Sequence, residues 1–223
     1  MANVLVNGIV IVSQPFGEYD RRLEILTADY GRISCFASGA RKPSSELVAA
    51  SRAFAMGSFE LYQGKSSYNL RHAKINEYFT SLSQDIDLTY YGFYFLEMCR
   101  YFSRENVEAK DMLNLLYFSL KALEKGQVDN QLIRSIFELK MLDINGICPA
   151  GEKIINPDER FSIGKELDPS TAYAIKFVLY SGPDKLYTFK LSERVMEEFI
   201  GVVSHLTLLL IDHKFKSLEF LDI

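Results

Sequence analysis

The spacing of apolar residues changes near residue 80. Before that point, short apolar runs alternate with polar residues at a period of two, and after it apolar residues recur three and four positions apart. The first period is typical of β-strands and the second of α-helices. The sequence therefore predicts a two-domain α+β protein, with a β domain over residues 1–80 and an all-α helical bundle over residues 81–223.

Five strands are expected in the first domain, over residues 4–13, 21–29, 32–38, 53–63 and 67–79. Tyr30 and Gly31 are expected to form a hairpin turn, because glycine accepts a positive φ. Gly57 lies inside the fourth strand and suggests a bulge or sharp bend. Five short strands, with an extended connection between the third and the fourth, favour a five-stranded OB-type barrel.

Helix boundaries are marked by local signals in the second domain. Ser81 and Gln84 form a capping-box pattern, which predicts that the first helix begins there. Gly126 and Gly146 are expected to end the next two helices, over residues 108–125 and 130–145. Asp168 followed by Pro169 predicts the start of a fourth helix.

A fifth helix is expected to begin at Ser192, and an irregular insert is expected at about residues 149–167, where proline and glycine recur. The fifth helix carries one apolar stripe that should be buried, made of Val195, Phe199, Val202, Leu206 and Leu209.

Composition is ordinary for a soluble globular protein, with 48% hydrophobic and 24% charged residues in 223. The most apolar stretch, residues 199–211, is shorter than the roughly 20 residues of a membrane-spanning helix. No export signal is visible at the N-terminus, so the cytoplasm is the expected location. Cys35, Cys99 and Cys148 are odd in number and far apart, which argues against a disulfide framework and a self-contained zinc site.

Charge is distributed unevenly between the two predicted domains. The chain has a net charge of -4, but residues 1–80 hold nine Lys/Arg against seven Asp/Glu, while residues 81–223 hold sixteen against twenty-two. The first domain is thus +2 and the second -6. In the positive domain, the segment "GARKPSSE" places Arg41 and Lys42 side by side in an exposed loop after the third strand.

Catalytic patterns are not found. His72, His205 and His213 have no metal-protease or carboxylate spacing, and neither a serine-hydrolase elbow nor a phosphate-binding loop occurs. Cys35 alternates onto the same face as Ile33, so it is expected in the barrel core. The expectation is a protein that is not an enzyme.

Nucleic-acid binding is better supported. Alternation along the third strand places Arg32 and Phe36 on the outer face, beside the loop of Arg41 and Lys42. Binding without sequence preference uses cations for phosphates and flat rings for bases. The alternative is that these residues are solvated charges on strand faces. The full set of candidates for DNA binding is Arg21, Arg22, Arg32, Phe36, Arg41, Lys42, Lys65, Arg71 and Lys74.

Four strings of this chain, in order and spacing, resemble the RecO family of bacterial DNA repair and recombination mediator proteins. They are "GIVIVSQPFGEYDRRLEILTADYGRISCFASGARKP", "AFAMGSFELYQGKSSYNLRHAKINEYF", "LIRSIFELKMLDINGICP" and "HKFKSLEFL". The resemblance implies an N-terminal OB fold, a helical body and, usually, a four-cysteine zinc element. It also implies a cytoplasmic, nucleoid-associated protein that binds single- and double-stranded DNA and promotes annealing. The implied protein partners are RecR, the acidic tail of single-stranded DNA-binding protein and, indirectly, the RecA recombinase.

This chain departs from the family at the zinc element. After Cys148 and Pro149 the paired CxxC motifs are absent, so we expect neither a structural zinc nor any other cofactor. The tail of single-stranded DNA-binding protein, which ends in phenylalanine, requires an apolar pocket and a cation for its carboxylate. Candidates in the third helix are Arg134, Phe137, Lys140 and Met141, with an ordinary solvated helix face as the alternative.

Two functions therefore remain open. The first is a recombination mediator whose barrel holds DNA and whose helical body holds protein partners. The second is an interaction scaffold in which the barrel has lost DNA binding and the helical body docks RecR or another protein.

Overall fold

The structure is a computed structural model that describes residues 3–64 and 67–221. The described residues form two compact units. The barrel unit extends to Asp85 and includes Gly92–Leu113, while the helical unit contains Ile86–Tyr91 and the residues from Asn114 onward. No helix in the described ranges is long and apolar enough to cross a membrane.

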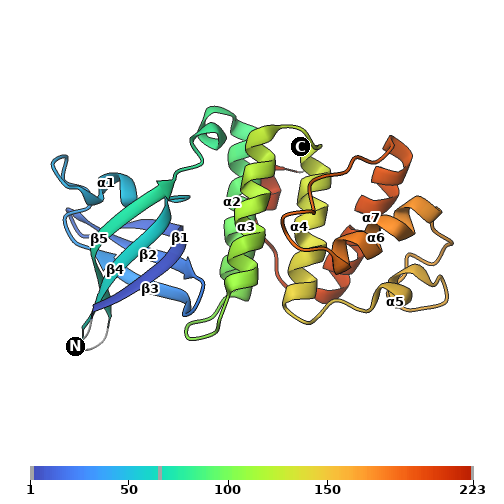
Figure 1. The fold of residues 1–223 in the computed structure, drawn as a ribbon, viewed down its shortest axis with the longest axis horizontal. Helices are drawn as coiled ribbons and strands as arrows, with labels where there is room; N and C mark the ends of the chain where they lie inside the picture. The colour runs from blue at the N-terminus through green and yellow to red at the C-terminus, as the bar shows by residue number, and fades with distance from the viewer. Residues whose placement is uncertain (1–2, 65–66, 222–223) are drawn as a thin grey trace. The chain divides into compact units, whose positions relative to one another are not determined.

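The barrel unit contains the predicted five strands, which close in the order β1-β2-β3-β5-β4 (Figure 1). Their bounds are β1 Asn3–Phe16, β2 Asp20–Thr27, β3 Gly31–Ala37, β4 Met56–Gln63 and β5 Tyr68–Glu77. Neighbouring strands are antiparallel except β3 and β5, which pair in parallel at Cys35–Tyr68 and Phe36–Asn69. The connection from β3 to β4 carries the short helix α1, Leu47–Ala50. The OB-type barrel followed by helices is thereby confirmed.

Alternate residues of every strand fill the barrel interior. Cys35 belongs to this core, as its position in the strand pattern predicts, and burial raises the pKa of its thiol to about 12. Burial of each large apolar side chain contributes roughly 1.5–3 kcal/mol to folding. The fully buried members with large side chains include Leu23, Ile25, Ile33, Phe59 and Leu61.

Glycine permits the barrel to close where two strands approach each other. The β4–β5 register shifts between Met56 and Gly57, so the bend predicted at Gly57 is present. A Cβ atom at Gly57 would collide with the backbone oxygen of Lys74. Irregularities of this kind increase the local twist and curl a short sheet into a barrel.

The turn between β2 and β3 differs from the expected two-residue connection. It comprises Ala28–Tyr30, and Gly31 begins β3 with a φ of 63°. Residues 103–109, which connect the first two long helices after the barrel, cover this turn, because Asn106 donates its backbone N–H to the oxygen of Tyr30 at 2.9 Å. A Cβ atom at Gly31 would collide with the oxygen of Arg104.

The start of the helical region also needs a correction. Ser81 and Gln84 lie in a 3₁₀ turn, η1 Thr80–Gln84, whereas the helix α2 spans Ile86–Phe102. Phe79, with a φ of 48° in the left-handed region, precedes this turn, and Ser83 donates its hydroxyl to the oxygen of Thr80. The capping-box prediction was therefore wrong by about one helical turn.

The later helices begin and end at the expected signals. Asp168 accepts the backbone N–H of Ser170 and caps α6, which has proline at its first position. Gly126 and Gly146, both with positive φ, follow α3 and α4. The helices are α3 Lys110–Lys125, α4 Asn130–Ile144, α5 Gly151–Ile155, α6 Pro169–Tyr180 and α7 Glu193–Leu210.

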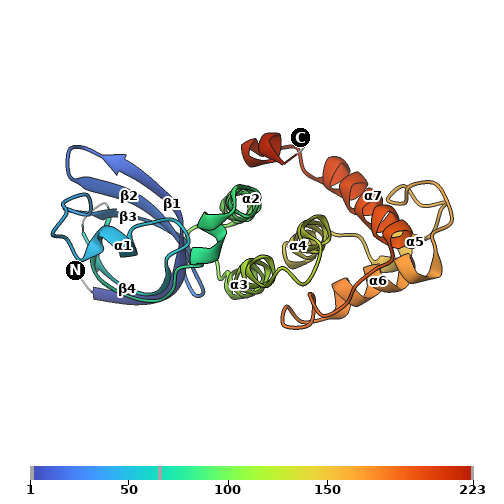
Figure 2. The same ribbon diagram turned by 90° about the horizontal axis from the view of Figure 1, so that it is seen from above.

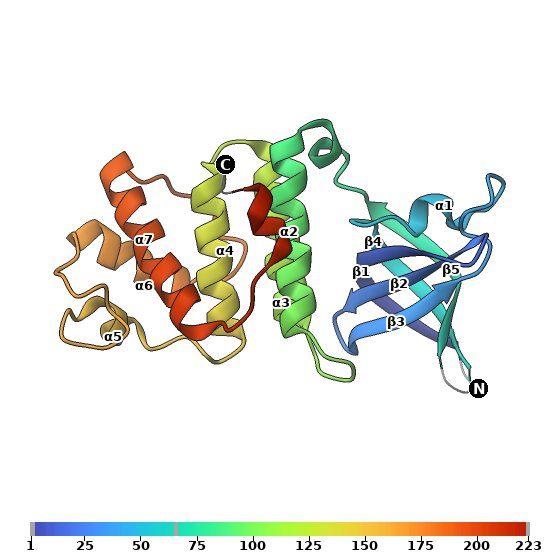
Figure 3. The same cartoon turned by 180° about the vertical axis from the view of Figure 1, so that it is seen from behind.

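In the helical unit, α4 packs against α6 and α7, and Figure 2 views α3 and α4 along their axes. The α7 stripe is buried as far as Leu206, but Leu209 is 41% exposed, because the last turn of α7 reaches the surface. The short turn η2, Lys216–Phe220, lies beside the first turns of α2 (Figure 3), where Phe220 stacks on Tyr90 at 4.9 Å. The expected insert at 149–167 contains α5 and turns.

Candidate nucleic-acid interface

One row of residues crosses the outer face of β2 and β3. Arg22 pairs with Phe36, and Phe36 pairs with Asn69 of β5. The Phe36 ring lies 4.8 Å from the ring of Phe16, which is 51% exposed. The exposed Arg22 donates from Nε to Ser34 Oγ at 3.3 Å. This face therefore combines a cation with two neighbouring rings.

The basic loop after β3 is held in one conformation by the β1–β2 turn. The backbone N–H of Gly39 donates to Asp20 Oδ1 at 2.7 Å, and that of Arg41 donates to the oxygen of Tyr19 at 2.8 Å. Arg41 Nη1 also donates to the backbone oxygens of Gly17 and Glu18 at 3.2 and 3.1 Å. The loop is thus attached to the turn through both its backbone and a side chain.

Lys42 lies against a ring of the same turn. Its Nζ is 5.2 Å from the centre of the Tyr19 ring, which is within the range of a cation–π contact. Arg41 and Lys42 are both exposed. Because Phe16 and Tyr19 flank the β1–β2 turn, the turn joins the basic loop to the β2–β3 face. We call Phe16, Tyr19, Arg22, Phe36, Arg41 and Lys42 the barrel surface.

Arg32 has a different environment from the one expected. Its Nη1 donates to the backbone oxygen of Arg100 in α2 at 3.0 Å and lies 3.4 Å from Glu24 Oε2. Arg100 binds both oxygens of Glu24, at 2.8 and 2.7 Å. Burial by itself would raise the pKa of Glu24, but the hydrogen bonds and charge of Arg100, aided by Arg32, hold that pKa below its ordinary value. Arg32 thus takes part in the attachment of α2 to the barrel.

Arg21 lies on the opposite side of β2 from Arg22. It pairs with Ala37, a core residue, and its Nη1 donates to Ser13 Oγ at 3.0 Å. Its Nε is buried and has no hydrogen-bond partner among the described residues. Arg21 is therefore separated from the barrel surface.

The remaining barrel candidates lie on β5 or outside the described residues. Arg71 is exposed and lies over the ring of Tyr62 at 5.1 Å, and Tyr62 pairs with Asn69, the neighbour of Phe36. Lys74 is exposed further along the same strand. Lys65 lies outside the described residues.

Sequence reasoning missed the rings that accompany these cations. Phe16, Tyr19 and Tyr62 were not among the candidates, although "QPFGEYD" places the first two on either side of a turn glycine. An exposed aromatic residue next to a hairpin turn was the available signal, because such a ring cannot reach the barrel interior.

The four candidates for partner binding on α4 do not form one exposed group. Phe137 and Met141 are completely buried in the helical core. Arg134 forms an ion pair with Glu138 at 2.9 Å, and Lys140 Nζ donates to the backbone oxygen of Leu179 at 2.6 Å. The Arg134 ion pair lies within α4, whereas Phe137, Met141 and the Lys140 hydrogen bond hold α4 within the helical unit.

Groups suited to catalysis or metal binding are dispersed. Among the residues that the structure describes, no three His, Cys, Asp or Glu side chains lie together in a metal-binding arrangement. Burial raises the pKa of Cys99, and burial followed by the charge of Asp143 raises that of Cys148 to about 12, so both thiols are poor nucleophiles. His72 and His213 are exposed and far apart in sequence.

Two family models match this chain. Residues 1–79 match the family model for the N-terminal part of recombination protein O, and residues 83–219 match the model for its C-terminal part. DNA repair protein RecO of Acetivibrio thermocellus is 28% identical over 220 residues, which cover 89% of this chain and 87% of that protein.

Two further relatives bear the same name. RecO of Clostridium perfringens is 25% identical over 99% of this chain and 98% of its own length, and RecO of Alkaliphilus metalliredigens is 30% identical over 66% of this chain and 59% of its own length. The two family models together span both the barrel and the helices. The chain therefore belongs to the RecO family of DNA repair proteins.

Proposed function

We propose that this protein is a non-enzymatic recombination mediator whose barrel surface binds single- and double-stranded DNA and promotes annealing of complementary strands. The observation that supports this proposal most directly is the attachment of the basic loop to the β1–β2 turn. This attachment places Arg41 and Lys42 next to exposed rings before any DNA strand binds.

Binding at this surface would not depend on base sequence. Cations that contact phosphates release counterions, and for single strands each such contact changes the slope of log K against log salt by about 0.7. Every base has a flat face, so rings such as Phe16 and Phe36 can stack on any base, at roughly 1–3 kcal/mol each. A surface with these two properties suits a protein that handles strands of arbitrary sequence.

Annealing and transfer of strands need no covalent step. The protein has to hold a strand with its bases accessible and then release it. Glu18 lies in the β1–β2 turn and Asp20 begins β2, next to the basic loop, so their negative charges would moderate the attraction for phosphates. We therefore expect binding that is salt-sensitive and readily reversible.

Protein partners complete the proposal. RecR, the tail of single-stranded DNA-binding protein and, indirectly, RecA are the partners proposed for this chain through its family. The buried positions of Phe137 and Met141 argue against the tail site expected on α4, so the proposed contact with the tail has no assigned residues.

The interaction scaffold is the second candidate, and one observation favours it. Arg21 and Arg32, two of the nine cations in the first 80 residues, are engaged within the barrel unit. Fewer cations are therefore available to phosphates than the sequence indicates. In this function the barrel would serve mainly as a framework and the helical unit would dock RecR.

A charge reversal separates these two functions. Arg41→Glu with Lys42→Glu should weaken binding of an oligothymidine, measured by fluorescence anisotropy, and should reduce the salt slope by about 1.4. Lys153→Glu, at an exposed position of α5, is the matched control. Unchanged affinity and slope in a folded double variant would overturn the DNA-binding role of the barrel surface and would favour a framework role for the barrel.

A further inference from the structure

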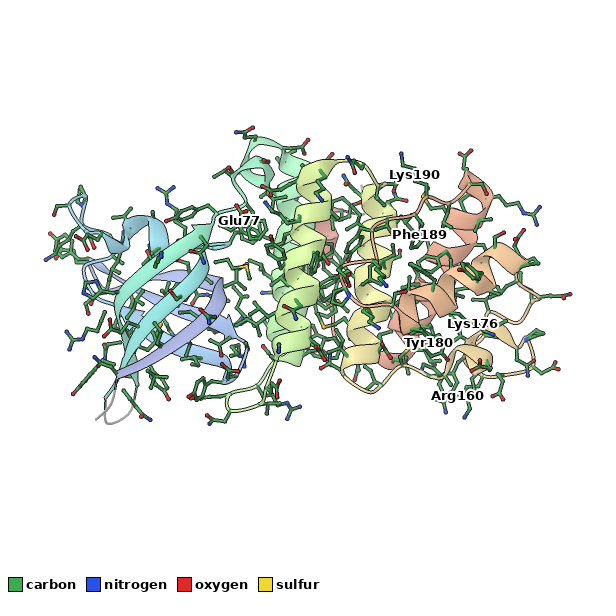
Figure 4. All side chains as sticks on the ribbon, in the orientation of Figure 1. Glu77, Arg160, Lys176, Tyr180, Phe189 and Lys190 are labelled. Carbon is green, nitrogen blue, oxygen red and sulfur yellow. The ribbon has the colours of Figure 1, made fainter. Side chains whose placement is uncertain are left out.

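Two adjoining pockets lie in the helical unit, between the helices and the segment that precedes α7. The first, the ring pocket, has a volume of about 560 Å³ and is lined mainly by Tyr173 and Phe177 of α6 and by Phe189. The second, the lysine pocket, has a volume of about 300 Å³ and is lined in part by Lys121 and Lys125 of α3. Thr188, Phe189 and Lys190 line both pockets, and Figure 4 labels Phe189 and Lys190.

The ring pocket presents flat aromatic faces. The Tyr173 and Phe177 rings lie 6.4 Å apart and are inclined by only 27°, while Phe189 meets Phe177 edge-on at 5.2 Å. Tyr173 is 71% exposed although it is a large ring. A solvent-accessible ring beside a half-buried one provides a platform for another flat group.

The charge of this region is opposite to that of its surroundings. Residues 169–192 contain three lysines and one aspartate, whereas the whole of 81–223 has a net charge of -6. Lys125 and Lys190 are exposed, Lys121 forms an ion pair with Glu124 at 2.8 Å, and Asp184 also lines the lysine pocket. The pocket thus gathers three cations in an acidic unit, at the cost of electrostatic repulsion among them.

We infer that the ring pocket and the lysine pocket together form a second binding site for single-stranded nucleic acid, separate from the barrel surface. A nucleic-acid strand presents flat bases and phosphates in regular alternation. The two pockets present aromatic rings and lysines around one shared segment, residues 188–190. Bases would stack on Tyr173 and Phe189, while phosphates would contact Lys125 and Lys190.

A different occupant, an acidic peptide with one aromatic side chain, fits the two pockets less completely. Such a peptide would fill the ring pocket with one side chain and would need only one cation beside it. The lysines come from two elements, α3 and the segment before α7, and the rings also come from two. This spread suits an extended polymer with repeating rings and charges.

A second site would give the proposed annealing activity a physical basis. One chain could hold one strand at the barrel surface and another at the two pockets. The inference does not rest on the barrel surface, because either site can bind a strand without the other.

The test uses pairs of variants in the 223-residue chain carrying Arg41→Glu and Lys42→Glu, so that binding at the barrel surface is weakened. Tyr173→Ala should weaken the remaining oligothymidine binding by about 5- to 160-fold through the loss of one stacked base. Tyr180→Ala is its control, since Tyr180 lies on the same helix, is 72% exposed and lies toward Lys176, away from Phe189 (Figure 4). Lys190→Glu should reduce the salt slope by about 0.7, and Lys153→Glu should not.

The location is tested independently by photocrosslinking of wild-type protein to an oligonucleotide that contains 5-iodouracil. Crosslinks at Tyr173 or Phe189 are expected beside those in the barrel. The inference is overturned if the barrel variant binds no oligothymidine at low salt, or if the Tyr173 and Lys190 variants behave like their controls. It is also overturned if a phenylalanine-containing oligoaspartate peptide binds these pockets and oligothymidine does not displace it.

Failure of the barrel proposal has a different signature. In that case, the charge reversal at Arg41 and Lys42 would have no effect, while the Tyr173 and Lys190 variants would still lose affinity.

Discussion

Arg100 binds both carboxylate oxygens of Glu24, through Nε at 2.8 Å and Nη2 at 2.7 Å. Glu24 belongs to β2 and is only 7% exposed, while Arg100 lies near the end of α2. Paired hydrogen bonds between these two groups are both strong and directional. They attach the second half of α2 to the barrel within one compact unit.

Removal of the arginine should destabilise the barrel unit. Arg100→Ala leaves the buried carboxylate with only the longer contact to Arg32, so we expect a loss of about 1–3 kcal/mol in the free energy of unfolding. Urea denaturation measures this loss. The double variant Arg100→Ala with Glu24→Gln should recover part of it, because the uncompensated charge is gone. Equal losses in the single and double variants would mean that the ion pair is not the cause.

The same pair predicts how stability depends on pH. The folded-state pKa of Glu24 lies below the ordinary value of 4.5, because the bonds and charge of Arg100 outweigh the opposing effect of burial. Glu24 therefore contributes stability above pH 4.5 that is lost as the pH falls through its lowered folded value. Urea midpoints measured between pH 7 and pH 3 should fall more steeply for wild type than for Glu24→Gln. Parallel curves would contradict the assignment.

Gly31 should be less tolerant of substitution than another glycine with similar backbone geometry. Gly31→Ala introduces both a strained positive φ and a collision with the oxygen of Arg104. Gly17→Ala, at a φ of 58° with open space around it, introduces only the strain, roughly 1–2 kcal/mol. We expect a clearly larger drop in melting temperature for Gly31→Ala. Similar drops in melting temperature would show that the segment between α2 and α3 moves aside for the added Cβ atom at little cost.

The rings of the barrel surface should contribute to affinity for single strands. Phe16→Ala removes an exposed ring that lies 4.8 Å from Phe36 and should weaken oligothymidine binding by about 1–3 kcal/mol, or roughly 30-fold at the middle of that range. Tyr78→Ala removes another exposed ring of the same unit and is the control, because Tyr78 follows β5 at the opposite end of that strand from Asn69, the residue that pairs with Phe36. Anisotropy titrations at constant salt compare the two. The stacking role of Phe16 is wrong if both variants bind like wild type.

The protein should also fold without zinc. The segment after Cys148 contains neither cysteine nor histidine up to residue 167, so a tetrahedral thiolate site cannot form there. We expect substoichiometric zinc in purified protein and an unchanged melting temperature after chelation. About one bound equivalent, together with unfolding on chelation, would contradict this expectation.

Local signals account for the parts of the fold that the sequence predicts well. The strands follow a period of two, and Gly57 marks a bulge that the register shows. Asp168 with Pro169 starts α6, and Gly126 ends α3, because these residues satisfy or terminate the backbone within a few positions. Such signals act between neighbours in sequence and need no knowledge of tertiary structure.

The site was less predictable because its residues depend on distant partners. Arg32 and Phe36 share a strand face, yet Arg32 is engaged by Glu24 and by Arg100, 68 positions away in the chain. Neighbouring Arg21 and Arg22 lie on opposite sides of one strand, and only one is exposed. On α4, burial extends around most of the helix, so a pattern of cations near Phe137 does not identify a surface.

The attachment of the basic loop to the β1–β2 turn has a kinetic consequence. Gly39 and Arg41 are already fixed by hydrogen bonds to that turn, so the binding of a DNA strand does not carry the entropy cost of ordering the loop. We therefore expect a DNA strand to be captured at close to the rate of diffusional encounter. Salt should lower this association rate by weakening the long-range attraction. The time that the strand stays bound should be set by the few bases stacked on the rings. Rapid arrival and short residence are the properties that allow one protein to pass a strand to the next.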